Sequence, residues 1–247
     1  MTTKLVAHRG FMAKYPENSL IGIEAALKAG ACMVEFDVQM NAGEDLFVIH
    51  DADLKRTAGL KKSVFDLSTE QLTGISIHEA RRFKQQFVPE PIPLLTDVLT
   101  LMGHYPERHA LVEIKEESIN HWGLEKVMQR LLAALENHRD QCVVISFDHK
   151  AVAYTQQHSK LATGWVVHRY NKKYQRLAEQ LTPDYLICNV TKIPDKGSLW
   201  PGNWRWMLYD ITKVADVLEL AQCDIAFIET ADIGGLLADT ALKNYGC

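Results

Sequence analysis

The sequence predicts an α/β fold, namely a closed (β/α)8 barrel (TIM barrel) with a small insertion after its second strand. Short apolar runs alternate with helical patterns along the 247 residues, as in parallel strands joined by right-handed crossovers. Eight strand-and-helix units in a chain of this length favour a closed barrel over an open sheet. No Gly-x-Gly-x-x-Gly or Gly-Lys-Ser/Thr loop supports the nucleotide-binding open sheet. The expected strands cover residues 5–7, 33–38, 110–115, 142–147, 161–168, 185–189, 204–209 and 225–228.

The helices are predicted from the spacing of their apolar residues. In the stretch 19–28, Leu20, Ile23, Ala26 and Leu27 fall on one side, and Gly30 follows as a stop signal. Further helices are expected to begin near residue 94 and to cover residues 122–137, 148–157, 174–180, 212–221 and 233–242.

Residues 51–92 interrupt this alternation. The stretch 53–65 is polar and rich in lysine, Ser68 is suited to cap a short helix with Gln71 at its third position, and three prolines between 89 and 93 exclude a helix there. We expect an insertion or lid within a single domain that spans residues 1–247. The short apolar run 46–49 before it is a ninth strand that is not counted among the eight.

Composition and charge exclude several classes of partner. The net charge of -4 and the pI of about 6.2 provide no basic surface for nucleic acid. No apolar run of about 18 residues exists, so no stable membrane insertion is expected, and the N-terminal residues lack a signal-peptide pattern, which predicts a cytoplasmic protein. The five cysteines form no Cys-x-x-Cys pair, and we expect buried, reduced thiols. The oligomeric state is left open.

The stretch 33–38 carries two carboxylates on one strand face, because strand side chains alternate with period two. Glu35 and Asp37 face one way, and Val34, Phe36 and Val38 face the other. A solvated face of an antiparallel sheet would explain this pattern. In a barrel interior, the same pair needs a cation, because an unpaired buried carboxylate is costly.

Other polar residues occupy the ends of the early strands, where barrel active sites form. Three carboxylates, two histidines and two cations are expected to meet at one rim. Carboxylates about 4 Å apart repel by about 4 kcal/mol at an effective dielectric constant of about 20, and a hard divalent ion, Mg²⁺ or Ca²⁺, would relieve this repulsion. Cations beside a metal suit a phosphate, and imidazoles exchange protons near neutral pH, so a phosphoester hydrolase is predicted. The residues are Glu35, Asp37 and Glu113, His8 and His50, and Arg9 and Lys115.

Six ordered motifs in residues 5–115 also resemble the glycerophosphodiester phosphodiesterases. The motifs are Ala7-His8-Arg9-Gly10, Pro16-Glu17-Asn18-Ser19, Glu35-x-Asp37-Val38, His50-Asp51, Ile92-Pro93 and Val112-Glu113-Ile114-Lys115.

This resemblance implies a barrel enzyme that cleaves a glycerophosphodiester to sn-glycerol 3-phosphate and an alcohol. It implies that the three carboxylates hold the divalent cation, that His8 and His50 are the acid–base pair, and that Arg9 and Lys115 bind the phosphate. It also implies that a free glycerol hydroxyl attacks phosphorus and gives a cyclic phosphate, which water then opens. Glu17 is expected to orient the loop beneath His8 and Arg9, and Asp51 to orient His50.

The late strands depart from the family pattern. A Trp-Thr-Val-Asn run is expected where Trp206-Met207-Leu208-Tyr209 stands, and a Thr-Asp pair where Glu229-Thr230 stands. These changes concern the fit of the alcohol portion of the substrate. Trp206 is expected either to form an aromatic wall against the glycerol carbons or to pack the late barrel together with Trp200 and Trp204. A phospholipase C-like enzyme without an essential ion, a non-catalytic phosphodiester-binding barrel and an unrelated glycoside hydrolase are the alternatives.

Overall fold

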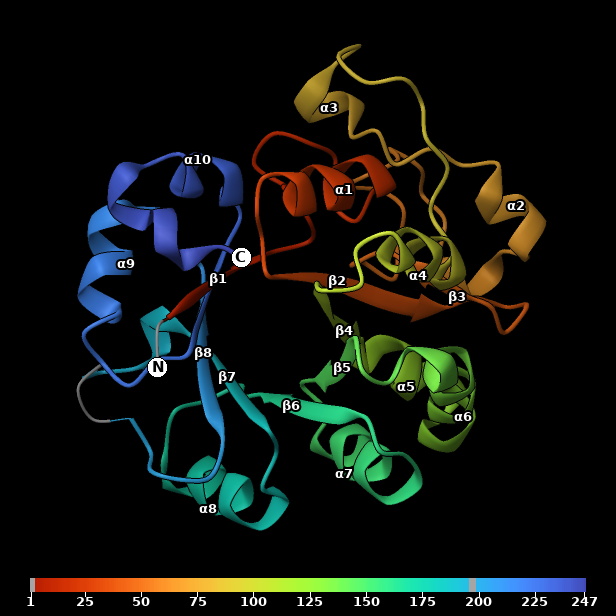
Figure 1. Cartoon of the computed structure of the whole chain (residues 1–247). Helices are drawn as coiled ribbons and strands as arrows, with labels where there is room; N and C mark the ends of the chain where they lie inside the picture. The colour runs from red at the N-terminus through yellow and green to blue at the C-terminus, as the bar shows by residue number, and fades with distance from the viewer. Residues whose placement is uncertain (1–2, 196–198) are drawn as a thin grey trace.

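Eight parallel strands form a closed barrel in the computed structural model, which describes residues 3–195 and 199–247 (Figure 1). Each strand pairs with the next around the ring, and the last pairs with the first, so Val6 lies in register with both Met33 and Glu229. The predicted barrel is therefore confirmed. In ring order the strands are β1 (Lys4–Ala7), β2 (Met33–Met40), β4 (His109–Ile114), β5 (Cys142–Ser146), β6 (Ala162–Val166), β7 (Tyr185–Asn189), β8 (Arg205–Tyr209) and β9 (Phe227–Thr230).

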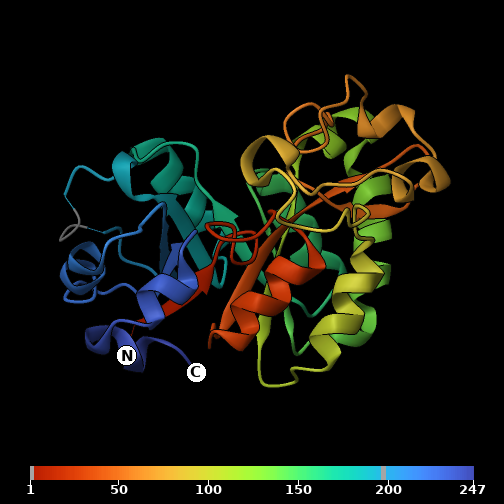
Figure 2. The same ribbon diagram turned by 90° about the horizontal axis from the view of Figure 1, so that it is seen from above.

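Helices cover the outside of the barrel (Figures 1 and 2). Ser19 caps the first of them by accepting a hydrogen bond from the backbone of Gly22 at 3.1 Å. The helix predicted at 122–137 is observed at Leu124–Leu135, and Gly123, at φ +89°, separates it from an earlier helix, Glu116–Trp122, that was not predicted. The helices are α1 (Leu20–Lys28), α4 (Leu95–Gly103), α5 (Glu116–Trp122), α6 (Leu124–Leu135), α7 (His149–His158), α8 (Lys172–Leu181), α9 (Val214–Leu220) and α10 (Ile233–Leu237), which precedes the 3₁₀ turn η4 (Thr240–Tyr245).

The period-two alternation of the strands divides the core into two layers. Phe36 and Val38 of β2 face outward into the apolar layer between strands and helices. The barrel interior holds a second apolar cluster, which includes Val6, Leu111, Val143, Ile145 and Met207. Because this interior is packed with side chains, the polar pocket of the barrel lies above it, at the carboxyl ends of the strands.

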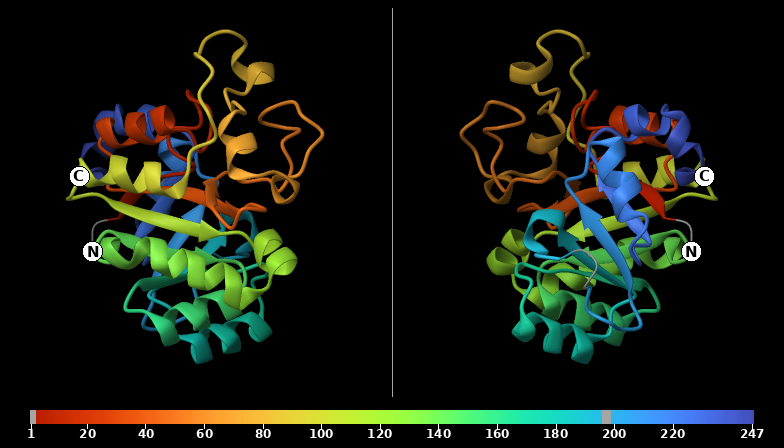
Figure 3. Two further views of the ribbon diagram at one scale, coloured as in Figure 1. Left: turned by 90° about the vertical axis from the view of Figure 1, so that its right-hand side faces the viewer. Right: turned by 90° about the vertical axis from the view of Figure 1, so that its left-hand side faces the viewer.

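The insertion begins after a hairpin that lies outside the ring. Strand β3 (Leu46–Val48) pairs antiparallel with β2, and the chain continues through η1 (Val64–Asp66), α2 (Thr69–Thr73) and α3 (Ala80–Phe83). Figure 3 shows this orange-to-yellow segment standing away from the barrel. It encloses its own small apolar core around Phe47, Leu54 and Leu72, and Ser68 with Gln71 forms the expected cap of α2.

The cysteines require a correction. Cys32 and Cys247 form a disulfide, whereas reduced thiols were expected for all five. The backbone N–H of Cys247 donates a hydrogen bond to Gly30 at 3.0 Å, which brings the C-terminal residue beside the start of β2. Cys142 and Cys188 are buried free thiols as predicted, and Cys223 is a half-buried free thiol. In the described residues, no helix combines the length and the apolar character that a membrane crossing requires.

Candidate active site

Three buried carboxylates meet at the carboxyl ends of β2 and β4. Asp37 lies in register with Glu113, and Glu35 lies two residues earlier on the same face of β2. One oxygen from each of the three lies within 4.8 Å of the others. Glu35 is only 2% exposed, Asp37 1% and Glu113 8%. The structure thus brings together the three residues predicted as metal ligands.

The electrostatics of this cluster suit a divalent cation. Burial, with Asp37 and Glu229 nearby, raises the pKa of Glu35 well above its usual value, and Oε1 of Glu35 is buried without a hydrogen-bond partner. Burial also raises the pKa of Glu113, although Lys115 opposes the shift. An all-oxygen set with an unsatisfied carboxylate fits a hard ion such as Mg²⁺ or Ca²⁺.

Two cations lie against Asp37. Nζ of Lys115 lies 3.2 Å from Oδ1 of Asp37 and 2.6 Å from Oε1 of Glu113, and Nε of Arg9 lies 3.1 Å from Oδ2 of Asp37. The Nε–H of Arg9 is not aligned for a good hydrogen bond, so this last contact is mainly ionic. Burial alone would raise the pKa of Asp37, but Lys115 and Arg9 hold it below its usual value.

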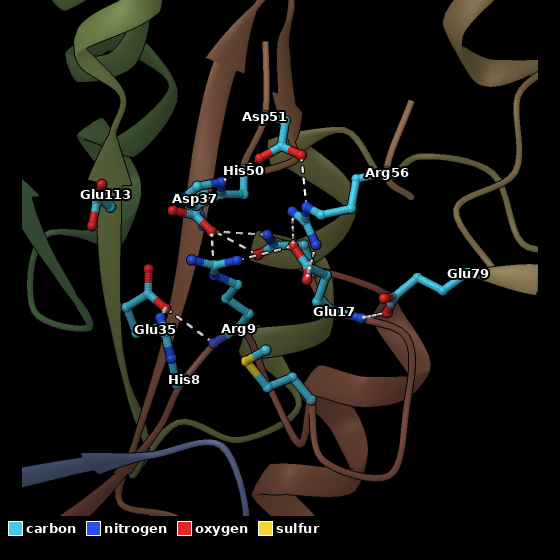
Figure 4. Close-up of polar contacts among 12 residues, drawn as sticks. His8, Arg9, Glu17, Glu35, Asp37, His50, Asp51, Arg56, Glu79 and Glu113 are labelled. Atoms are coloured by element: carbon cyan, nitrogen blue, oxygen red, sulfur yellow. Dashed lines mark hydrogen bonds and ion pairs between the residues drawn. The ribbon is translucent and has the colours of Figure 1, made fainter. Parts of the chain in front are cut away.

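The two histidines line the same pocket, which has a volume of about 190 Å³. Nε2 of His8 lies 3.9 Å from Oε2 of Glu35, and burial together with Arg9 lowers the pKa of His8 to about 3. Nδ1 of His50 lies 2.6 Å from Oδ1 of Asp51. In Figure 4, His8 and His50 appear on either side of the Arg9 guanidinium. Every predicted histidine, carboxylate and cation of the site therefore faces one cavity or borders it.

A chain of alternating charges connects the insertion to this cavity (Figure 4). Arg56 donates from Nε to Asp51 at 2.7 Å, and from Nη1 and Nη2 to Glu17 at 2.6 and 2.7 Å. Glu17 in turn accepts from Nη1 of Arg9 at 3.1 Å. Its backbone N–H donates to Oε2 of Glu79 at 2.8 Å. Arg56 and Glu79 were not among the predicted site residues, because they lie in the polar insertion and no local pattern singles them out.

The opposite wall of the pocket is largely apolar. It is formed by Ile145, Phe147, Val166, Ile187 and Met207, and its polar groups come from Tyr209, Asp210 and Glu229. Burial, with Glu113 nearby, raises the pKa of Glu229 well above its usual value. Glu229 was noted in the sequence only as a departure from the family pattern.

The expected aromatic wall formed by Trp206 requires a correction. Because side chains alternate along β8, Met207 and Tyr209 face the pocket and Trp206 faces outward. Trp206 is 5% exposed in the layer outside the barrel, and its indole N–H donates to the carbonyl of Trp200 at 3.0 Å. Its ring packs edge-on against that of Trp200. The pocket wall therefore takes its aromatic rings from Phe147 and Tyr209 rather than from Trp206.

Comparisons with known proteins agree with this geometry. A glycerophosphodiester phosphodiesterase of Bacillus altitudinis is 36% identical over 152 residues, which are 61% of this chain and 60% of the relative. The matched region thus covers about three fifths of that relative's length. A counterpart from Caldanaerobacter subterraneus is 31% identical over 60% of each chain.

Solved structures share the fold along nearly the whole chain. A phosphodiesterase of Oleispira antarctica, solved with the product sn-glycerol-3-phosphate, superposes with a TM-score of 0.84, 19% identity and 96% coverage of both chains. A glycerophosphodiester phosphodiesterase of Thermotoga maritima gives a TM-score of 0.74, 19% identity and coverage of 96% and 98%. The family model "Glycerophosphoryl diester phosphodiesterase family" matches residues 8–195. This chain belongs to the glycerophosphoryl diester phosphodiesterase family.

Proposed function

We propose that this protein hydrolyses glycerophosphodiesters to sn-glycerol 3-phosphate and an alcohol. The observation that carries the proposal is the convergence of three buried carboxylates, two cations and two imidazoles on one pocket. Family membership supports it, as does the Oleispira antarctica structure, which was solved with this product. The substrate is a small molecule of a size suited to the cavity of about 190 Å³.

Glu35, Asp37 and Glu113 would hold the divalent cation, Mg²⁺ or Ca²⁺. When bound, such an ion supplies Lewis-acid stabilisation of the charge that develops on the phosphoryl oxygens. The protein's own contribution is to fix the carboxylates on two adjacent, hydrogen-bonded strands. The surrounding apolar interior keeps them poorly solvated, which strengthens every charge interaction in the site.

Arg9 and Lys115 neutralise and orient the phosphate. His8 and His50 share the proton transfers: one imidazole takes the proton of the attacking oxygen, and the other gives a proton to the oxygen of the departing alcohol. The bond from phosphorus to the attacking oxygen forms as the bond to the alcohol oxygen breaks. Nδ1 of His50 is hydrogen-bonded to Oδ1 of Asp51 at 2.6 Å, so Nε2 is the nitrogen that can exchange a proton with the substrate.

Replacing either histidine tests this assignment. His8→Ala and His50→Ala are each expected to lower kcat on glycerophosphocholine and glycerophosphoethanolamine by about 10²-fold or more, with an unchanged circular dichroism spectrum. His104, which is exposed at the end of α4, provides the matched control in His104→Ala. Turnover at the parent rate in both site variants would refute the acid–base roles.

Removing the metal tests the cofactor. Exhaustive chelation is expected to abolish hydrolysis, and added Mg²⁺ or Ca²⁺ to restore it. The release of sn-glycerol 3-phosphate should be followed directly, because it also identifies the bond that is cut. Activity that survives chelation would contradict the metal requirement and would favour a phospholipase C-like enzyme.

A further inference from the structure

Glu229 is a buried carboxyl group in the pocket that the proposed mechanism does not use. It lies on β9 and is 4% exposed, and it lines the same cavity as His8, Arg9 and Lys115. Its Oε1 atom is buried and has no hydrogen-bond partner. A buried acceptor without a partner destabilises a fold. We therefore expect that a ligand in the pocket donates a hydrogen bond to this oxygen.

Glu229 is separate from the carboxylates that would hold the metal. In the described part of the chain, the oxygens that lie within 4.8 Å of one another come from Glu35, Asp37 and Glu113, and this group does not include Glu229. Glu229 stands on the other side of β1, in register with Val6, whereas Glu35 stands on β2. The two carboxyl positions thus flank the strand that leads to His8.

The neighbours of Glu229 define what it can bind. Met207 of β8 pairs with Phe227 of β9, and the same register places Tyr209 beside Glu229. The rest of this wall is apolar, with Ile187 and Met207 below. A phosphodiester group has no hydrogen-bond donor and cannot satisfy Oε1, so we place Glu229 against the part of the substrate that carries no phosphate. The group that satisfies Oε1 must donate a hydrogen bond, and a hydroxyl does so.

We propose that Glu229 is a specificity residue that accepts a hydrogen bond from a hydroxyl of the substrate's glycerol unit. This inference rests on the proposed function. Glycerol is the part that all glycerophosphodiesters share, and it fits the enclosed inner wall. The head group varies in size and therefore belongs at the open mouth of the pocket, where Asp210 is exposed. Glu229 stands where the family resemblance led us to expect threonine.

Two substitutions separate recognition from folding. Glu229→Met removes both oxygens at similar volume, and Glu229→Gln keeps one acceptor. Glu229→Met is expected to lower kcat/KM on glycerophosphocholine and on glycerophosphoethanolamine equally, by roughly ten- to hundredfold. Glu229→Gln should recover part of the loss. Both variants should cleave bis(p-nitrophenyl) phosphate, which has no hydroxyl, within about twofold of the parent. Asp224→Asn, which changes an exposed carboxyl outside the pocket and before the amino end of β9, serves as the control.

The choice of substrates distinguishes the outcomes. The quaternary ammonium group of choline cannot donate a hydrogen bond, so a loss on glycerophosphoethanolamine alone would assign Glu229 to the head group and overturn the proposal. An equal loss on all three substrates would assign it a general structural role. An apolar side chain suits this buried position better than a carboxyl group. A higher melting temperature of Glu229→Met, together with a loss of kcat/KM on the two glycerophosphodiesters alone, would therefore support a role of Glu229 in recognition rather than in stability.

Binding measurements make the test independent of turnover. Calorimetric titration should show that Glu229→Met weakens the affinity for sn-glycerol 3-phosphate by at least about tenfold and leaves the affinity for inorganic phosphate unchanged. Equal affinities of parent and variant for sn-glycerol 3-phosphate would refute the subsite. Failure of the parent itself to cleave any glycerophosphodiester would instead refute the proposed function.

The affinity for a metal ion tests whether Glu229 is instead a metal ligand. If Glu229 were a metal ligand, Glu229→Met would weaken the binding of Mn²⁺, used as the probe, by an order of magnitude or more, as loss of a coordinating carboxylate does. We expect the Mn²⁺ affinity to stay within about twofold of the parent value. A large decrease would overturn the assignment to glycerol.

Discussion

At the scale of single residues, the side chain of Glu17 lies between two positively charged side chains. It is buried, yet its carboxylate contacts two guanidinium groups, those of Arg9 and Arg56. Burial alone would raise its pKa, but the hydrogen bond from Arg56 and the charge of Arg9 lower it below the usual value of 4.5. A carboxyl with a lowered folded-state pKa stabilises the fold above the unfolded-state pKa, and this contribution is lost as the pH falls.

Glu17→Gln should therefore destabilise the protein in a pH-dependent manner. At pH 7 we expect the free energy of unfolding to fall by about 2 to 3 kcal/mol, because three charge-assisted hydrogen bonds lose their acceptor charge. The difference should shrink as the pH falls below about 4, because the carboxyl of the unfolded chain is protonated there, and it should vanish once the folded-state carboxyl, with its lowered pKa, is protonated as well. Urea unfolding between pH 3 and pH 8 measures it. Glu24→Gln, which removes an exposed ion pair with Lys28, provides the control. If the free energies of unfolding of the parent and of Glu17→Gln changed in parallel with pH, the expected loss of stabilisation at low pH would be contradicted.

At the scale of elements, the insertion contacts the rim of the pocket through Arg56. This side chain holds Asp51, and Asp51 lies against Nδ1 of His50. The orientation and tautomer of the His50 imidazole therefore depend on a segment outside the barrel. This dependence does not require the insertion to move, and its role as a lid stays a prediction.

Asp51→Asn and Arg56→Met should both lower kcat by roughly tenfold or more. The first replaces the charged acceptor at Nδ1 of His50 by an amide that can also donate and so favour the other tautomer, and the second removes the group that positions Asp51. KM should change less, since neither residue is among those that line the pocket. The pH profile of kcat should shift in both variants, a change that a general loss of stability does not produce. Arg81→Met, on the exposed part of α3, is the matched control. Unaltered pH profiles would show that His50 is positioned by other contacts.

The sequence could predict elements and site residues that depend on local pattern. Alternation with period two assigned Glu35 and Asp37 to one face, and the barrel architecture brought Glu113 beside them. Contacts between distant segments were not predictable in the same way. The ion pair of Arg56 with Glu17 spans 39 residues, and nothing near either residue indicates its partner. Trp206 was misassigned because one position along a strand exchanges the inner for the outer face.

At the scale of the whole molecule, the disulfide joins the C-terminal residue to the start of β2. Cys32 and Cys247 are separated by 215 residues, so the bond closes nearly the entire chain into a loop. In the chain-entropy model, a loop of this length stabilises the folded state by at most about 5 kcal/mol, although measured values are commonly 2 to 4 kcal/mol. The pairing also bears on the predicted cytoplasmic location, because a reducing compartment would keep both residues as thiols.

Cys247→Ser should lower the melting temperature of the oxidised protein by several degrees and leave that of the reduced protein unchanged, because only the oxidised parent has a restricted unfolded state. Activity should be retained in both redox states, since the bond lies at the amino end of β2 and the pocket at the carboxyl ends of the strands. Cys223→Ser, which changes a half-buried free thiol, provides the control. Equal melting temperatures of parent and Cys247→Ser under oxidising conditions would mean that Cys32 and Cys247 are thiols in solution, as the sequence alone had suggested.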